Sequence, residues 1–188
     1  VETLGSIFAS TSKEASSNYG IGYDGRIGMY VEEQDRSWCT SSASNDKRAI
    51  TIEVASDTYH PYRVKDVAYK SLIKLLVDIC KRNGIKKLVW STNKSERMNH
   101  LNGCNMTVHR DYANKSCPGD YLYNLHGQIA KEVNAQLGLG TSSTANKTLY
   151  RVRKTWNDEQ SQKGAFYDLS NAKKCADKNI GYSVFDES

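Results

Sequence analysis

The sequence lacks any apolar run that approaches the ~20 residues needed to cross a bilayer. Its first four residues, Val1-Glu-Thr-Leu4, also lack the basic, apolar and cleavage regions of a secretory signal. Because the first residue is Val and not Met, the missing signal says little about targeting. The residues present therefore indicate no segment that inserts into a membrane or directs the chain to one.

The sequence also lacks an even set of cysteines and a concentrated charge of one sign. Its five cysteines are odd in number and irregularly spaced, which excludes a full disulfide framework and favours synthesis in a reducing compartment. The formal net charge is +5, from 26 Lys and Arg against 21 Asp and Glu, and the basic residues are scattered. This charge suits an acidic cell wall as well as nucleic acid, and no nucleic-acid motif supports the second partner.

Hydrophobic residues make up 38% of the 188 residues, enough for one globular domain and a small second module. Alternation, helical periodicity and turn residues predict elements in the order β-β-β-α-β-α. They comprise a hairpin over 18–31 that turns at Asp24-Gly25, a strand over 48–55, a helix over 64–80, a strand over 88–90 and a helix over 120–137. The fold class is therefore expected to be α/β, with a mixed central sheet flanked by helices.

A run of small polar residues over 138–147 is typical of a flexible linker between a main domain, 1–137, and a small module, 148–188. In the module, the pattern predicts strands over 150–153 and 181–185 and a helix over 170–178. The module is therefore expected to be a small α+β unit.

His109 and Cys117 lie eight positions apart at the two ends of a polar loop. An imidazole and a thiolate are reasonable zinc ligands, and a catalytic zinc needs three protein ligands and an open position. Considered alone, His109 is more simply a hydrogen-bonded loop histidine and Cys117 a buried thiol. The neighbouring residues shift this balance toward a metal site.

The stretches Val108-His-Arg-Asp and Lys115-Ser-Cys-Pro-Gly resemble the zinc motif of the N-acetylmuramoyl-L-alanine amidases, the family of phage lysozyme-type amidases and peptidoglycan-recognition proteins. Asn18-Tyr-Gly-Ile-Gly-Tyr-Asp-Gly-Arg-Ile is similar to the family's hairpin, and Ala49-Ile-Thr-Ile-Glu-Val to its glutamate-bearing strand. The likeness is greatest to clostridial and clostridial-phage lysins and covers residues 1 to about 137. It implies zinc-dependent hydrolysis of the muramoyl-alanine amide bond in bacterial peptidoglycan.

The resemblance implies a role for each matching residue. His109 and Cys117 would bind Zn²⁺, Glu53 would be the general base for the attacking water, and Lys115 would help to stabilise the oxyanion. Without the family, Glu53 is one polar residue on the solvent face of an alternating strand. The family's first zinc ligand is a His on an apolar strand before the hairpin, and no residue here matches it. A catalytically silent peptidoglycan-binding protein is therefore the alternative function.

Four residues are candidates for substrate contacts: Asn18, Tyr19, His60 and Trp156. The C-terminal module, which contains Trp156, resembles the small wall-binding modules of clostridial lysins. Its aromatic side chains could stack on sugars or could equally form the module's own core. A lysin of this kind is expected to be made in the host cytoplasm and to act at the cell wall.

Overall fold

The computed structural model describes residues 1–139 and 148–186, which divide into two compact units, Val1–Thr141 and Ser142–Ser188. The predicted linker, 138–147, lies outside the described residues except for its first two positions. Among the helices described, none is both long enough and apolar enough to cross a membrane. Each unit is treated below by itself.

The first unit contains a three-stranded sheet in the order β2-β1-β3. Strand β1, Tyr19–Ile21, pairs antiparallel with β2, Ile27–Met29, and parallel with β3, Ile52–Val54. The hairpin forms as predicted, but its connection is longer than a two-residue turn, because the Gly22 N–H donates to the Arg26 carbonyl at 2.8 Å. The parallel and antiparallel pairs together make the mixed sheet that the fold class requires, so that prediction is confirmed.

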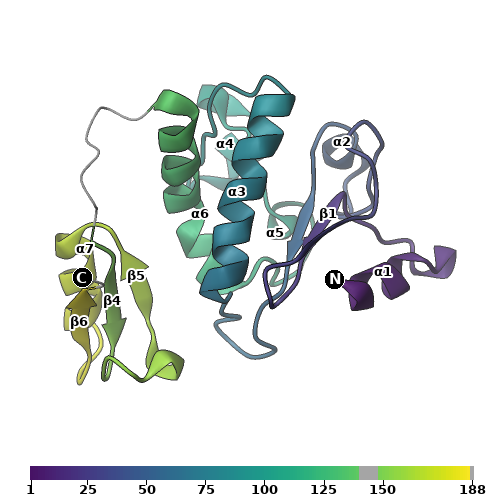
Figure 1. The fold of residues 1–188 in the computed structure, drawn as a ribbon. Helices are drawn as coiled ribbons and strands as arrows, with labels where there is room; N and C mark the ends of the chain where they lie inside the picture. The colour runs from purple at the N-terminus through teal and green to yellow at the C-terminus, as the bar shows by residue number, and fades with distance from the viewer. Residues whose placement is uncertain (140–147, 187–188) are drawn as a thin grey trace. The chain divides into compact units, whose positions relative to one another are not determined.

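Two long helices lie side by side, α3, Asp66–Arg82, and α6, Gly119–Asn134, and α3 contacts strand β1 (Figure 1). Both were predicted from apolar residues at three- and four-residue spacing, and most of these residues form the buried face of each helix, although Val67 is 47% exposed. The core between helices and sheet contains Tyr19, Ile21, Val64, Ala68, Leu72, Ile73, Leu75, Val77, Ile79, Leu88, Leu122, Ile129, Ala130 and Val133. The last turn of α6 continues as a wider helical segment, Ala135–Leu139.

Shorter helices were not predicted because they span too few residues to show a period. They are α1, Glu2–Phe8, α2, Ala43–Asp46, α4, Lys94–Met98, and α5, His109–Tyr112, with 3₁₀ turns at Thr11–Lys13 and Leu101–Gly103. Local caps begin two of them, since the side chains of Ser42 and Asn93 accept from backbone N–H groups of α2 and α4. Leu4 of α1 lies against Gly20 of β1, where an added Cβ would come within 2.8 Å of it.

The predicted strand over 88–90 is wrong. This segment has no strand partner in the part of the chain that the structure describes, and side chains bind its backbone instead. The Asn134 amide accepts from the Leu88 N–H at 2.7 Å and donates to the Leu88 carbonyl at 2.8 Å, while Asn105 accepts from the Val89 N–H at 2.8 Å. Two asparagines thus replace the ladder that an apolar tripeptide alone suggested.

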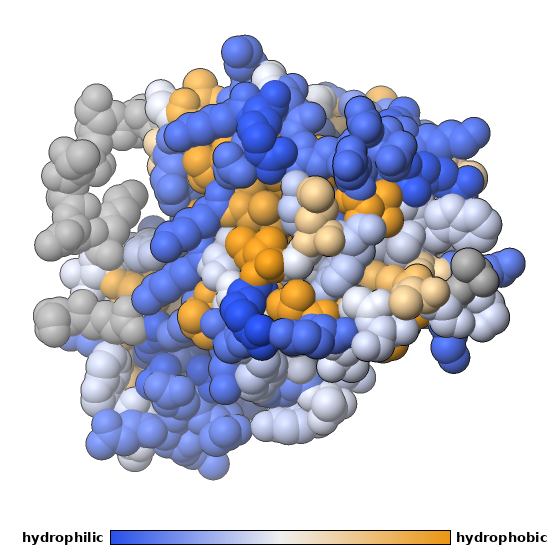
Figure 2. All heavy atoms as spheres, turned by 45° about the vertical axis from the view of Figure 1, so that its right-hand side comes forward, coloured by the Kyte–Doolittle hydropathy of each residue, from blue (hydrophilic) through white to orange (hydrophobic). Residues whose placement is uncertain are grey.

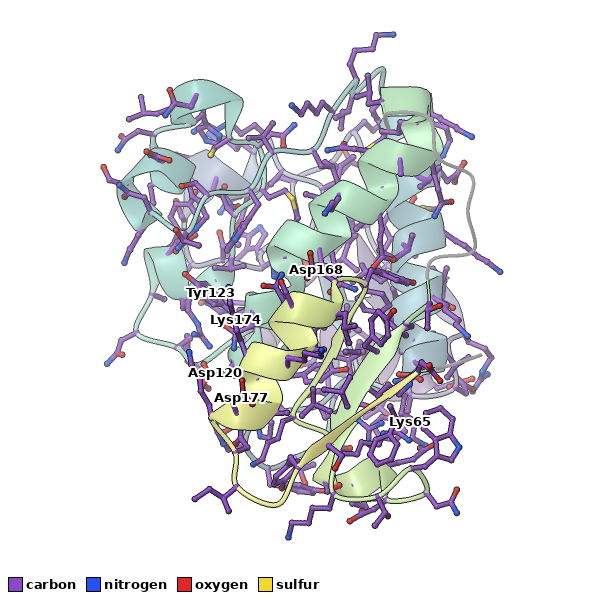
Figure 3. The ribbon with its side chains drawn as sticks, turned by 90° about the vertical axis from the view of Figure 1, so that its left-hand side faces the viewer. Lys65, Asp120, Tyr123, Asp168, Lys174 and Asp177 are labelled. Atoms are coloured by element: carbon purple, nitrogen blue, oxygen red, sulfur yellow. The ribbon has the colours of Figure 1, made fainter. Side chains whose placement is uncertain are left out.

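The second unit is a three-stranded antiparallel sheet in the order β5-β4-β6 with one helix, α7. The elements are β4, Tyr150–Arg153, a 3₁₀ turn at Glu159–Ser161, β5, Gly164–Phe166, α7, Leu169–Asp177, and β6, Ser183–Asp186. Asp168 caps α7 by accepting from the Ser170 N–H at 2.8 Å, and Lys174 and Asp177 lie further along the helix (Figure 3). The sequence predicted β4, α7 and β6 but not β5, whose three residues include Gly164.

Candidate active site

A cavity of about 380 Å³ opens beside β3 in the first unit. Its lining brings together Glu53, His109, Cys117 and Cys39, with apolar residues of α3 and α6 forming much of the remaining wall. A mostly hydrophilic face of the molecule shows apolar side chains gathered in its middle (Figure 2). Concave, largely apolar spaces with a few convergent polar groups are the usual form of a small-ligand or active site. Sequence positions 64 residues apart, 53 and 117, thus meet in one place.

Glu53 occupies the centre of β3, opposite Gly20 of β1. Its carboxyl group is partly buried at the cavity wall, and this desolvation raises its pKa. The Cys39 thiol donates to its Oε1 at 3.7 Å, which opposes the rise. A carboxylate with few hydrogen bonds and a raised pKa is a stronger base than an exposed one.

His109 is the first residue of α5 and lines the same cavity. Its Nε2 lies 3.4 Å from the Ser41 hydroxyl. Burial lowers the pKa of the imidazole, and the neighbouring Lys115 ammonium lowers it further. Both effects favour the neutral imidazole, which is the form that binds a metal or accepts a proton.

A buried ion pair fixes the backbone next to His109. Arg97 of α4 meets Asp111 through two contacts, Nε to Oδ2 at 2.8 Å and a terminal nitrogen to Oδ1 at 2.5 Å. The side chains are only 2% and 1% exposed. Asp111 also accepts from the Val108 N–H at 3.3 Å, and the Arg97 guanidinium lies 4.5 Å from the Trp90 ring centroid. This network determines where α5 begins and therefore where His109 lies.

Cys117 ends the loop that starts at His109. Its carbonyl accepts from the Arg110 N–H at 3.2 Å, and burial followed by the nearby Glu53 charge raises the pKa of its thiol to about 11. The loop leads into α6 through Gly119, whose φ is +78°, and a Cβ added at this position would come within 2.7 Å of the Tyr62 Cβ, so a side chain does not fit. The same close packing places Cys117 at the cavity.

Imidazole and thiolate are donor types that zinc prefers, but their number is one short of a catalytic site. Among residues 1–139 and 148–186, no group of three or more His, Cys, Asp or Glu side chains has the arrangement of a metal site. The described residues therefore do not form a complete zinc centre by themselves. Strand β3, on the cavity wall, is also an edge strand: the side of it that faces away from β1 has no strand partner in the described part of the chain.

The other predicted site residues lie in varied surroundings. Lys115 is exposed near His109. Asn18 is fully buried and bonds Thr51 and the 31–35 backbone, while the Tyr19 hydroxyl donates to Glu33 at 2.7 Å. His60 is exposed and lies 3.1 Å from Asp120, which projects from α6 near Tyr123 (Figure 3). Trp156 belongs to the second unit, is 42% exposed and packs on Phe185. Their roles in substrate binding stay predictions.

Two features of the site were not found by sequence reasoning. Cys39 lies far from both zinc-motif residues in sequence, and no spacing marks it as a neighbour of Glu53. Arg97 lies 14 positions before its partner Asp111, although Asp111 stands inside the recognised motif. Each contact is tertiary, so only the folded chain reveals it.

One of the comparisons with known proteins identifies a family for this chain. No curated protein and no solved structure matches the chain significantly. The family model of the N-acetylmuramoyl-L-alanine amidases matches residues 3–120, which include Glu53, His109 and Cys117. Because this match spans more than half of the 188 residues, the chain belongs to the N-acetylmuramoyl-L-alanine amidase family.

Proposed function

We propose that the protein hydrolyses the amide bond between the lactyl group of N-acetylmuramic acid and the L-alanine of the stem peptide, as a zinc-dependent lysin at the bacterial cell wall. Family membership supports an amidase-type hydrolase with peptidoglycan as its substrate. The observation that carries the finer statement is the meeting of Glu53, His109 and Cys117 at one cavity.

Glu53 is the general base of the proposed reaction. Its carboxylate takes a proton from water as the water oxygen attacks the amide carbon. The carbon–nitrogen bond then breaks, and the proton passes from Glu53 to the leaving amine of alanine. The products are a lactyl carboxylate and a stem peptide with a free amino terminus. The raised pKa of Glu53 suits both steps, because the group must accept and then release the same proton.

His109 and Cys117 are the proposed zinc donors of this chain. Zinc held near Glu53 would supply Lewis-acid polarisation of the carbonyl. The thiol of Cys117, whose pKa is about 11 in the metal-free protein, must lose its proton on binding, so binding releases a proton and weakens in acid. Residues 1–139 and 148–186 contain no third His, Cys, Asp or Glu side chain arranged to complete a metal site with these two.

The test uses purified peptidoglycan and counts newly released alanine amino groups. We expect release by the wild-type chain, inhibition by a chelator, and a loss of at least roughly 100-fold in Glu53→Gln, since a positioned general base contributes 10²–10⁴-fold. Glu14→Gln, an exposed carboxylate, is the matched control and should keep full activity. Activity retained by Glu53→Gln would remove Glu53 from the mechanism.

The incomplete ligand set favours a second candidate, a peptidoglycan-binding protein without catalysis. Such a protein sediments with cell walls and releases no amino groups. Elemental mass spectrometry separates the two, with His109→Ala as the control. About one zinc per chain, lost in His109→Ala, supports the hydrolase, and absence of zinc together with wall sedimentation supports the binder.

A further inference from the structure

Cys39 is the only side chain with a hydrogen bond to the Glu53 carboxylate in the part of the chain that the structure describes. Its Sγ lies 3.7 Å from Oε1, within the range of a thiol donor. The two groups approach from different elements, Glu53 from β3 and Cys39 from the loop before α2, and both line the cavity. Other carboxylates of this unit accept from N–H or O–H donors, such as the Arg97 guanidinium at Asp111, the Tyr19 hydroxyl at Glu33 and the Ser91 hydroxyl at Glu96.

The loop that bears Cys39 is held firmly. Thr40 donates through its backbone N–H to Asp46 at 3.1 Å and through its hydroxyl at 2.6 Å, and it accepts from Asn45 at 3.2 Å. Asn45 in turn accepts from the Thr107 hydroxyl at 3.3 Å. Thr40, Asn45 and Asp46 are all buried. These hydrogen bonds hold the loop in one conformation, with the Cys39 thiol next to Glu53.

The same loop reaches the other half of the site. Ser41, two positions after Cys39, has φ of +61° and lies 3.4 Å from the His109 Nε2. One short segment thus contacts the proposed base through Cys39 and a proposed metal donor through Ser41. The segment therefore lies beside both the strand that carries Glu53 and the helix that carries His109.

We propose that Cys39 is a positioning residue for Glu53, whose thiol hydrogen directs the carboxylate toward the water attacking the substrate amide. The inference rests on the proposed amidase function and assigns to this site a residue outside the zinc motif. A catalytic base works best when a third group orients it. A cationic partner would also hold Glu53 in place, but its charge would lower the pKa of the carboxyl group and so make it a weaker base. A neutral thiol orients the carboxylate with a smaller decrease in its pKa.

Burial supports the neutral form of this donor. Desolvation, and then the nearby Glu53 charge, raise the pKa of the Cys39 thiol, so the S–H persists through the neutral range. A neutral thiol donates one weak hydrogen bond and cannot compete with Glu53 for the proton of water. Cys39 and Glu53 therefore have distinct roles, with Glu53 alone exchanging protons.

The test compares Cys39→Ala, which removes the donor, with Cys39→Ser, which keeps one, in the full chain. We expect Cys39→Ala to lower kcat roughly tenfold or more while KM and zinc content stay near wild type, because misplacement of a catalytic group affects the chemical step. Cys39→Ser should recover most of kcat. Cys175→Ala, on α7 of the second unit, is the matched thiol control and should match wild type.

The pH profile separates positioning from packing. In Cys39→Ala, the acid limb of kcat should move to higher pH, since the lost hydrogen bond favoured the charged carboxylate. Unchanged kcat and an unchanged acid limb in Cys39→Ala would overturn the proposal, as would equal losses in the Ala and Ser variants. Both variants are folded if their thermal midpoints match that of wild type. If Cys39→Ala unfolds, Cys39→Val, which also lacks a donor but fills more of the space, takes its place with the same expected loss of kcat.

A readout without activity distinguishes this inference from the proposed function. Carbon-13 NMR of carboxyl-labelled glutamate, assigned through Glu53→Gln, reports on Glu53 whether or not the chain hydrolyses peptidoglycan. If wild type releases no alanine amino groups, the amidase proposal fails. The thiol contact still stands if the Glu53 resonance shifts in Cys39→Ala and returns in Cys39→Ser, and it fails if the resonance is unmoved in both.

Discussion

Two carboxylates flank the site in opposite surroundings. Asp111, beside His109, is almost fully buried and bound by two nitrogens of Arg97 and a backbone N–H. Glu53, on the cavity wall, is partly buried, and among residues 1–139 and 148–186 the Cys39 thiol is the one side chain that donates a hydrogen bond to it. Asp111 therefore has three strong donors around its charge, whereas the charge of Glu53 has one weak donor.

This difference suits Asp111 to a structural role and Glu53 to the proposed proton transfer. A carboxylate held by two guanidinium nitrogens and a backbone N–H is fixed in place, which suits a group that positions the start of α5. A carboxylate with a raised pKa and an open side can move a proton. Neutralising the two groups should therefore have opposite effects on stability, and this contrast can be measured.

The largest expected effect follows from neutralising Asp111. In Asp111→Asn, Arg97 would keep a buried charge without its counter-charge, and breaking such a pair costs about 3–5 kcal/mol of unfolding free energy. Urea denaturation at neutral pH measures the loss, with the exposed Asp35→Asn as control. A loss below about 1 kcal/mol would show that the pair is not what holds α5.

A smaller effect of opposite sign is expected at Glu53. Its folded pKa is raised above the unfolded value, so its contribution to stability is present in acid and is lost as pH rises through the folded pKa. Glu53→Gln has no such loss. With metal removed by a chelator, the variant should match wild type in acid and become the more stable protein as pH rises from about 4.3, the ordinary glutamate value. Parallel stability curves across that range would contradict the desolvated state of Glu53.

The contrast also explains which parts of the molecule the sequence could predict. Helices α3 and α6 and the hairpin depend on local periodicity and turn residues, and they were predicted correctly. Residues 88–90 have the composition of a strand, but a strand exists only with a partner, and here Asn134 and Asn105 bind the backbone. Glu53 was selected through motif order, while the thiol that contacts it and the arginine that holds Asp111 depend on tertiary packing that no local pattern records.

The smallest effect on stability is expected at the rim of the site. His60 and Asp120 are 3.1 Å apart with side chains 72% and 52% exposed, and exposed pairs contribute about 0–1 kcal/mol. His60→Ala should therefore leave the free energy of unfolding in urea within about 1 kcal/mol of wild type, yet raise KM for a muramoyl-peptide roughly two- to tenfold if its imidazole hydrogen-bonds the substrate as predicted.

The control is Asp120→Asn, which weakens the same pair but keeps the imidazole, so its KM should stay near wild type. An equal rise of KM in both variants would assign the effect to the ion pair, and unchanged KM in His60→Ala would remove His60 from the substrate groove.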